Sequence, residues 1–208
     1  MNYEILTAFV LTSSVLAISP GPDNIFVLTQ SIAYGKRLGL ATAFGFVGGC
    51  LVHTTLLAFG LSAVVKMNTV LFWAIKIFGA CYLLFLTYKV YKSDAHIEII
   101  KVKNNQTNAL ALFQKGFVMN VLNPKVTVFF LAFFPGFLFS DELGLVVQFY
   151  TLGLLFMLVT LVVFGSIALL AGSISQYIGN SPKTAIYLKW VQIIVFVGIA
   201  LYLVLSDY

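Results

Sequence analysis

The sequence predicts an all-α polytopic membrane protein with six transmembrane helices, and two observations support this fold class. Of its 208 residues, 61% are hydrophobic and only 9% are charged, whereas soluble domains average about 45–50% apolar and about 25% charged residues. The apolar residues also form six stretches, each longer than the roughly 20 residues that a membrane-spanning helix needs. Only helices and closed barrels satisfy the backbone within a membrane, and the stretches are continuous rather than alternating, which favours helices.

The six stretches differ in length. The first, second and fifth are longer than one upright crossing requires, which predicts a tilt or a break in each of them. In chain order the stretches are Ile5–Tyr34, Leu38–Val65, Val70–Tyr91, Gly116–Phe139, Leu143–Ala171 and Thr184–Leu205.

The net charge of +5 does not indicate nucleic-acid binding, because the basic residues lie at the ends of the apolar stretches. Nine of the twelve Lys and Arg residues share one side of the membrane if the N-terminus is outside. The positive-inside rule places that side in the cytoplasm. We therefore expect both termini outside and the basic polar segment Lys92–Gln114 in the cytoplasm.

The two halves of the chain contain similar short segments in the same order. "AFGLSAVV" (Ala58–Val65) and "GACYLLFL" (Gly79–Leu86) correspond to "VFGSIALL" (Val163–Leu170) and "GIALYLVL" (Gly198–Leu205). We predict one membrane domain with a first three-helix repeat (1–92), a cytoplasmic linker (93–114) and a second three-helix repeat (115–208). Three spans per half insert the second half inverted, and such 3+3 inverted repeats are typical of transporters with a substrate site near the midplane.

Prolines interrupt the first stretch at Ser19–Asn24, "SPGPDN". Pro20 and Pro22 each remove a helical amide, and Gly21 loosens the backbone between them. Asp23 lies about 16 Å by helical rise from the end of the stretch, near the middle of a hydrocarbon core about 30 Å thick. An acid at that depth usually faces a cavity or a partner. Asp23 therefore titrates or binds a substrate amine, or else it caps the helix that resumes at Asn24.

The fourth stretch is interrupted in the corresponding place, at "NVLNPK" from Asn120 to Lys125. Pro124 frees the carbonyl of Asn120 beside the polar side chains of Asn120 and Asn123. Lys125 is equally deep, and it either snorkels or pairs with a carboxylate, for which Asp23 is the obvious candidate. We expect snorkelling or another partner rather than a direct pair. Two proline breaks in matching places of inverted halves indicate a transport site.

Three further features lie within the spans. We expect His53 to be neutral and bonded to a hydroxyl such as that of Thr54 or to a backbone carbonyl, with a proton relay as the alternative because histidine titrates near neutral pH. Gly45–Gly49 is a G-x-x-x-G pattern that we assign to internal helix packing, with a contact between copies in a homo-oligomer as the alternative. Cys50 and Cys81 form no C-x-x-C motif and are expected to be buried small hydrophobes.

The segments "SPGPDNIFVLTQSIAYGKRLGL", "GFVGGCLVH" and "FVMNVLNPKVTVFFLAFFPGF" resemble the LysE/RhtB family of amino-acid exporters over nearly the whole chain. The resemblance implies export of amino acids or their derivatives across the bacterial inner membrane, driven by the proton-motive force. The family motifs fall on residues of both breaks and on His53, and the reasoning on the second break adds Asn120. The candidate residues for substrate binding and proton coupling are therefore Pro20, Gly21, Pro22, Asp23, Asn24, His53, Asn120, Asn123, Pro124 and Lys125.

The residues favour a proton-coupled exporter of a small zwitterion. Helix N-termini that restart after Pro22 or Pro124 offer amides to a carboxylate, and Asp23 or freed carbonyls offer acceptors to an ammonium. Efflux of a metal cation or another small metabolite is the alternative, although one acid and one histidine are few ligands for a cation site. A membrane enzyme is less favoured, because neither H-E-x-x-H nor C-x-x-C occurs. We expect an amino-acid substrate, protons and the lipid bilayer as partners, with no cofactor, metal or nucleic acid.

Overall fold

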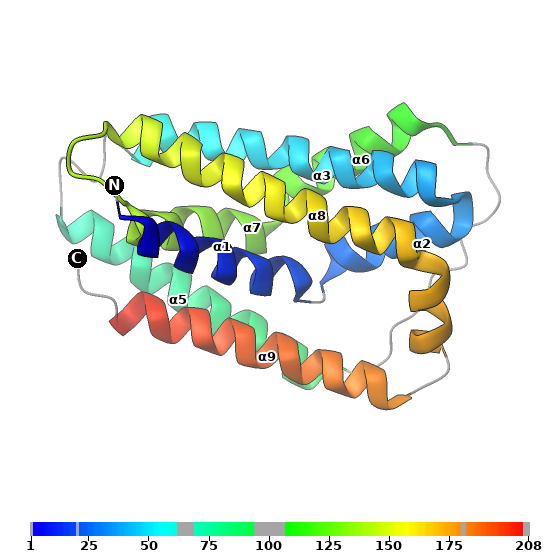
Figure 1. Ribbon diagram of the computed structural model, residues 1–208. Helices are drawn as coiled ribbons and strands as arrows, with labels where there is room; N and C mark the ends of the chain where they lie inside the picture. Colours follow the sequence, from blue (N-terminus) through cyan, green and yellow to red (C-terminus); the bar gives the residue numbers. More distant parts are fainter. Residues whose placement is uncertain (1, 20, 62–68, 94–106, 180–181, 206–208) are drawn as a thin grey trace.

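The computed structural model describes residues 2–19, 21–61, 69–93, 107–179 and 182–205, and within these ranges the chain is helical without strands (Figure 1). Two short π-helical segments and one 3-10 turn interrupt the α-helices. The helices are α1 (Tyr3–Ile18), α2 (Pro22–Tyr34), α3 (Lys36–Leu56), α5 (Thr69–Lys92), α6 (Ala109–Val121), α7 (Pro124–Val128), α8 (Leu145–Gly179) and α9 (Pro182–Leu205). The interruptions are η1 (Leu57–Leu61), η2 (Phe129–Phe133) and η3 (Phe134–Phe137).

Four to six candidate membrane spans follow from the length and composition of these helices. Four helices, in α3, α5, α8 and α9, are each long and apolar enough to cross a membrane. If each bent pair is one span, two further spans are formed by α1 with α2, bent by 60°, and by α6 with Pro124–Phe137, bent by 49°. Successive passes alternate in direction, so that α9 ends at the same end of the molecule at which α1 begins (Figure 1). The predicted breaks in the first and fourth spans are therefore present, while the inverted repeat stays a prediction.

The fourth span differs from its expected form at both ends. Helix α6 begins at Ala109, inside the expected linker 93–114, because the side chain of Asn108 caps it by accepting a hydrogen bond from the Ala111 amide at 2.8 Å. Residues 94–106 of that linker lie outside the described residues. Beyond α7 the chain continues as η2 and η3 instead of a regular helix.

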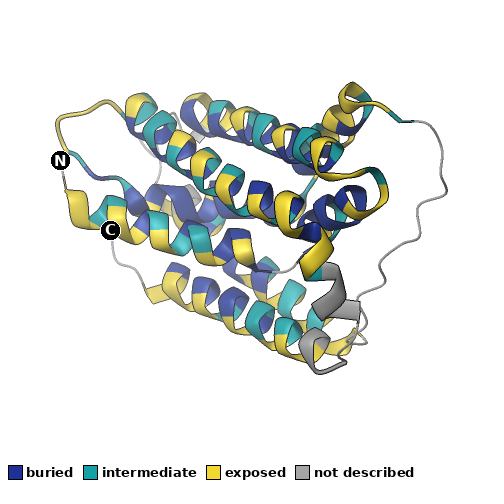
Figure 2. Cartoon of the chain, turned by 45° about the vertical axis from the view of Figure 1, so that its right-hand side comes forward, coloured by how far each residue is buried: buried dark blue, intermediate teal, exposed yellow. Residues whose placement is uncertain are grey.

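Phenylalanines from η2 and η3 form the main core, together with Phe9 of α1 and Phe156 of α8. The ring centroids of Phe130 and Phe134 are 4.1 Å apart, and Phe9 meets Phe134 edge-on at 5.1 Å. Buried residues line the faces between helices, and exposed residues lie on the outward faces (Figure 2). Many of these exposed side chains are large and apolar, as expected of surfaces that face lipid.

Glycines allow α3 and α6 to pack along each other. A Cβ atom on Gly45 would collide with the backbone carbonyl of Phe113, and one on Gly116 would collide with that of Thr42. A Cβ atom on Gly49 would meet the side chain of Asn120 at 2.6 Å. The G-x-x-x-G pattern is thus used inside the chain, which confirms the first of its two predicted uses.

The two cysteines have different surroundings. Cys50 is buried on α3, as expected, whereas Cys81 is exposed on α5. The prediction was wrong for Cys81 because the outward face of a membrane helix is as apolar as a protein core, so an apolar run does not distinguish the two.

We predict that Gly45→Ala lowers the free energy of unfolding by about 1–3 kcal/mol. The added methyl group would collide with backbone atoms of α6, which cannot move away as a flexible side chain could. Gly198→Ala in α9 is the matched control, since a Cβ there would have no neighbour within 4 Å, and it should leave stability unchanged or raise it by up to about 1 kcal/mol. Thermal unfolding in detergent measures both. Equal stability of the two variants would contradict the packing described for α3 and α6.

Candidate functional site

The two proline breaks meet about midway along the molecule (Figure 1). Helix α1 extends about 24 Å to one side of the first break and α2 about 20 Å to the other, by helical rise. Helix α7 begins at the second break beside the end of α1, which places Lys125 against the first break. Residues of both breaks therefore form one buried polar site.

A buried ion pair joins the two breaks. The Nζ atom of Lys125 lies 3.8 Å from Oδ2 of Asp23, and the residues are only 5% and 6% exposed. Lys125 Nζ also donates to the carbonyl of Ser19 at 3.4 Å. Lys125 therefore does not snorkel, and it has both the other partner that we expected, the Ser19 carbonyl, and the direct pairing with Asp23 that we did not expect.

Gly21 makes room for this ion pair. A Cβ atom at Gly21 would lie 2.5 Å from Oδ1 of Asp23 and 3.3 Å from Nζ of Lys125. Gly21 is also the N-cap of α2, and no side chain caps that helix. The alternative in which Asp23 caps a helix that resumes at Asn24 is therefore wrong. The helix resumes at Pro22, and Asp23 lies in its first turn, where the helix dipole favours a negative charge.

Other polar residues satisfy carbonyls near the breaks. The Asn24 side chain donates to the Ala17 carbonyl at 2.8 Å. Nε2 of His53 lies 3.2 Å from the carbonyl oxygen of Asn120, and since a carbonyl only accepts, Nε2 carries the proton. This confirms the predicted bond from His53 to a backbone carbonyl, and the carbonyl is the one that Pro124 frees from its usual partner.

The second break is capped by its own side chain. Asn123 is the N-cap of α7, and its Oδ1 accepts from the Lys125 amide at 3.0 Å. Pro124 occupies the first turn of that helix, as Pro22 does in α2, where the missing amide costs no hydrogen bond. Pro20 lies outside the described residues. Ion-pair, capping and carbonyl-binding roles are thus divided among the candidate residues.

Cys50 also belongs to this site, although the sequence did not identify it as a site residue. The Nδ2 atom of Asn120 donates to its sulfur at 3.6 Å. Cys50 precedes His53 by three positions and so shares its helix face. That spacing was the available signal, but it did not reveal that the face meets Asn120.

The site contains more hydrogen-bond acceptors than the protein uses. Among the described residues, four buried oxygens of the two breaks have no hydrogen-bond partner. Leaving such an atom unsatisfied costs about 1–3 kcal/mol, so the site can accept N–H groups from a ligand. The four atoms are Oγ of Ser19, Oδ1 of Asp23, Oδ1 of Asn24 and Oδ1 of Asn120.

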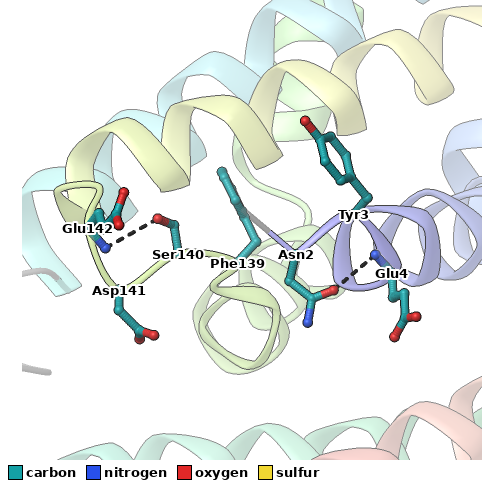
Figure 3. A pocket seen from close by; sticks show the side chains of 7 residues that line it. All are labelled: Asn2, Tyr3, Glu4, Phe139, Ser140, Asp141 and Glu142. Atoms are coloured by element: carbon teal, nitrogen blue, oxygen red, sulfur yellow. Dashed lines mark hydrogen bonds between the residues drawn. The ribbon is translucent and has the colours of Figure 1, made fainter.

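An open pocket of about 680 Å³ lies at the end of the molecule where α1 begins (Figure 3). It is lined by Asn2–Glu4 and by Phe139–Glu142, the loop before α8. The Ser140 hydroxyl accepts from the Glu142 amide at 3.3 Å, and buried Gln148 accepts from the Phe139 amide at 2.8 Å. These bonds hold the loop that forms one wall of this acidic, polar pocket. Within the described residues no three His, Cys, Asp or Glu side chains are grouped so that they could hold a metal ion.

Comparison with known proteins relates the chain to transporters. A family model described as LysE type translocator matches residues 14–207. A homoserine/homoserine lactone efflux protein of Salmonella typhimurium is 32% identical over 183 residues, which cover 88% of this chain and 87% of the relative. The protein of the same description from Salmonella typhi is 31% identical over the same shares. An uncharacterized membrane protein of Vibrio cholerae is 28% identical over 88% of each chain. No solved structure matches.

We predict that Asp23→Asn and Lys125→Met each lower the free energy of unfolding by about 3–5 kcal/mol, because each leaves one buried charge without its partner. The double variant should lose much less than the sum of the two, since it buries no charge. Denaturant unfolding in detergent measures all three proteins. Strictly additive losses would show that the two side chains do not interact.

Proposed function

The chain belongs to the LysE type translocator family, and on that premise we propose that it exports an amino acid or amino-acid derivative across the bacterial inner membrane by proton antiport. Membership of this family makes it a multi-pass membrane transporter for efflux and not an enzyme. Two relatives are described as efflux proteins for homoserine and homoserine lactone, which supports a small amino-acid-type substrate for this chain.

The buried Asp23–Lys125 pair is the observation that carries the proposal. A zwitterionic amino acid bears the same two charges as this pair and can replace each partner of it. The substrate ammonium binds the Asp23 carboxylate and the unsatisfied oxygens of Asn24 and Asn120. The substrate carboxylate binds Lys125 and the N-terminus of α2, whose dipole favours an anion.

Proton coupling follows from competition for one carboxylate. A proton on Asp23 removes the negative charge that holds Lys125 and the substrate ammonium. Substrate and proton then occupy Asp23 in turn, and this alternation is what antiport requires. His53 is the second candidate proton carrier, since its bond to the Asn120 carbonyl uses only one of its two ring nitrogens.

Transport requires that the site open to each side in turn. Asp23 and Lys125 are almost completely buried, so a substrate reaches them only when the helices around them separate. We assign this motion to rocking of residues 1–92 against 115–208 as inverted halves, with the two breaks between them. We further propose that both termini face outside and that the end of α5 and the start of α6 at Ala109 face the cytoplasm.

Transport of a panel of labelled amino acids, including homoserine, out of whole cells or into inverted vesicles tests the function. We expect at least one amino acid to move, and its transport to stop when the pH gradient is collapsed. A panel in which no amino acid moves would refute the proposal, and movement that ignores the pH gradient would refute antiport.

The double variant Asp23→Asn/Lys125→Met separates transport from folding in the same assay. Because its replacement side chains are neutral, it buries no unpaired charge and should fold. We nevertheless expect it to export nothing, because both charges that match the substrate are gone. Export at the wild-type rate by the folded double variant would give the pair a purely structural role.

Cysteine labelling tests the orientation. In a Cys81→Ser background, which removes the exposed native thiol, Asp141→Cys should react with an impermeant reagent from outside. Ala109→Cys should react only after the membrane is opened, because the start of α6 lies on the opposite side. The reverse pattern would invert the proposed topology.

A further inference from the structure

Two buried hydroxyl groups on α1 and α8 have no hydrogen-bond partner among the described residues. They are Oγ of Ser13, on α1, and Oγ1 of Thr160, on α8. Ser13 is completely buried and Thr160 is only 3% exposed. Burying a hydroxyl without a partner is unfavourable, so the stability of the fold does not explain why either group is there.

Serine and threonine in a helix commonly satisfy their hydroxyl by donating to the carbonyl four residues earlier. Other hydroxyls on the same two helices do so. Ser14 on α1 and Ser166 on α8 each donate to such a carbonyl at 2.7 Å. Ser13 and Thr160 make no such bond, so both hydroxyls are available to a ligand.

The two hydroxyls lie at the same height on neighbouring helices. Helices α1 and α8 pack along each other and begin at the same end of the molecule (Figure 1). Phe9 of α1 and Phe156 of α8 both contact the ring of Phe134, at centroid distances of 5.1 and 6.1 Å. Ser13 and Thr160 each follow one of these two phenylalanines by four positions, so each lies one turn further along its helix and on the same face.

Ser13 approaches the first break along α1. Ala17 lies one turn beyond Ser13, and the Ala17 carbonyl accepts from the side chain of Asn24. Asn24 adjoins Asp23 in the first turn of α2. The Ser13 hydroxyl therefore lies about one to two helical turns, roughly 5–10 Å, from the pair of Asp23 and Lys125, on the side toward the start of α1.

Thr160 approaches the second break from α8. Phe156, one turn before Thr160, lies 5.3 Å from the ring of Phe130, and Phe130 lies 5.4 Å from the ring of His53. His53 in turn contacts the carbonyl of Asn120. The two unpaired hydroxyls thus approach the two breaks from two different helices.

We propose that Ser13 and Thr160 determine which amino acid is exported, by binding an uncharged polar group on its side chain while Asp23 and Lys125 bind its charged groups. A hydroxyl both donates and accepts, so the two together can bind a substrate hydroxyl or amide. An apolar side chain of the same shape would leave both of them unpaired and would therefore be rejected. A short side chain followed by a hydrogen bond of about 2.8 Å reaches them from the ion pair. This assignment rests on the proposed function, because it names the substrate class of the same site.

Transport of isosteric pairs of amino acids into inverted vesicles tests this assignment. The pairs are homoserine with norvaline, threonine with valine and asparagine with leucine, and in each pair a polar group replaces an apolar one of similar size. We expect the wild type to move the polar member of at least one pair faster. Ser13→Ala and Thr160→Val should each lower that ratio of rates about three- to tenfold, the effect of one net hydrogen bond.

Matched variants separate specificity from folding. Ser14→Ala and Thr151→Val remove hydroxyls that are bonded within their own helices, so neither should change the ratio. Thr160→Ser keeps the hydroxyl and should keep the preference. Thr160→Val removes an unsatisfied hydroxyl from the core, so its melting temperature should equal or exceed that of the wild type. A hydroxyl needed only for folding would give a lower melting temperature and an unchanged ratio.

The outcomes distinguish this assignment from the proposed function. If no amino acid is transported, the proposed function is wrong and the assignment fails with it. If amino acids are transported but no polar member moves faster than its apolar isostere, only the assignment is wrong. It is also wrong if Ser13→Ala and Thr160→Val both fold and keep the wild-type ratio.

Discussion

The pairing of Asp23 with Lys125 is the interaction on which the middle of this protein depends. Each charge is expensive to bury alone at membrane depth, and each sits in the first turn of a helix that restarts after a break. Their contact at 3.8 Å therefore holds two interrupted helices against each other. Removing only one of the two side chains would leave the other charge buried without its partner where the two breaks meet.

The backbone at the breaks explains why so many polar residues gather there. Carbonyls that lose their helical partners must be satisfied inside the protein, because lipid offers no donors. The side chain of Asn24 donates a hydrogen bond to the Ala17 carbonyl, that of Lys125 to the Ser19 carbonyl and that of His53 to the Asn120 carbonyl. These donors stabilise the break and surround the proposed site, so structural and transport roles of one residue are not exclusive. Acceptors that remain unsatisfied are the part that the fold alone does not explain.

Local features of the structure were predictable from the sequence, and contacts between distant segments were not. Apolar run length predicted the spans, and Pro22 and Pro124 predicted the breaks, because each signal lies within one continuous stretch of sequence. The Asp23–Lys125 contact joins segments about a hundred positions apart, and no local pattern distinguishes it from snorkelling. The linker is shorter than expected because Asn108 caps the start of α6. The sequence signal for that cap was a single residue, which is weak evidence for a helix start. Exposure of Cys81 was missed because lipid and protein core favour the same side chains.

A density map of the protein with its exported amino acid bound would test the central claim most directly. We predict density for the substrate between the two breaks, with its carboxylate against Lys125, its ammonium against Asp23, and the two side chains moved apart from their present 3.8 Å contact. A map with the substrate elsewhere and the Asp23–Lys125 pair still in contact would contradict the account. The pair would then serve only to hold the broken helices together.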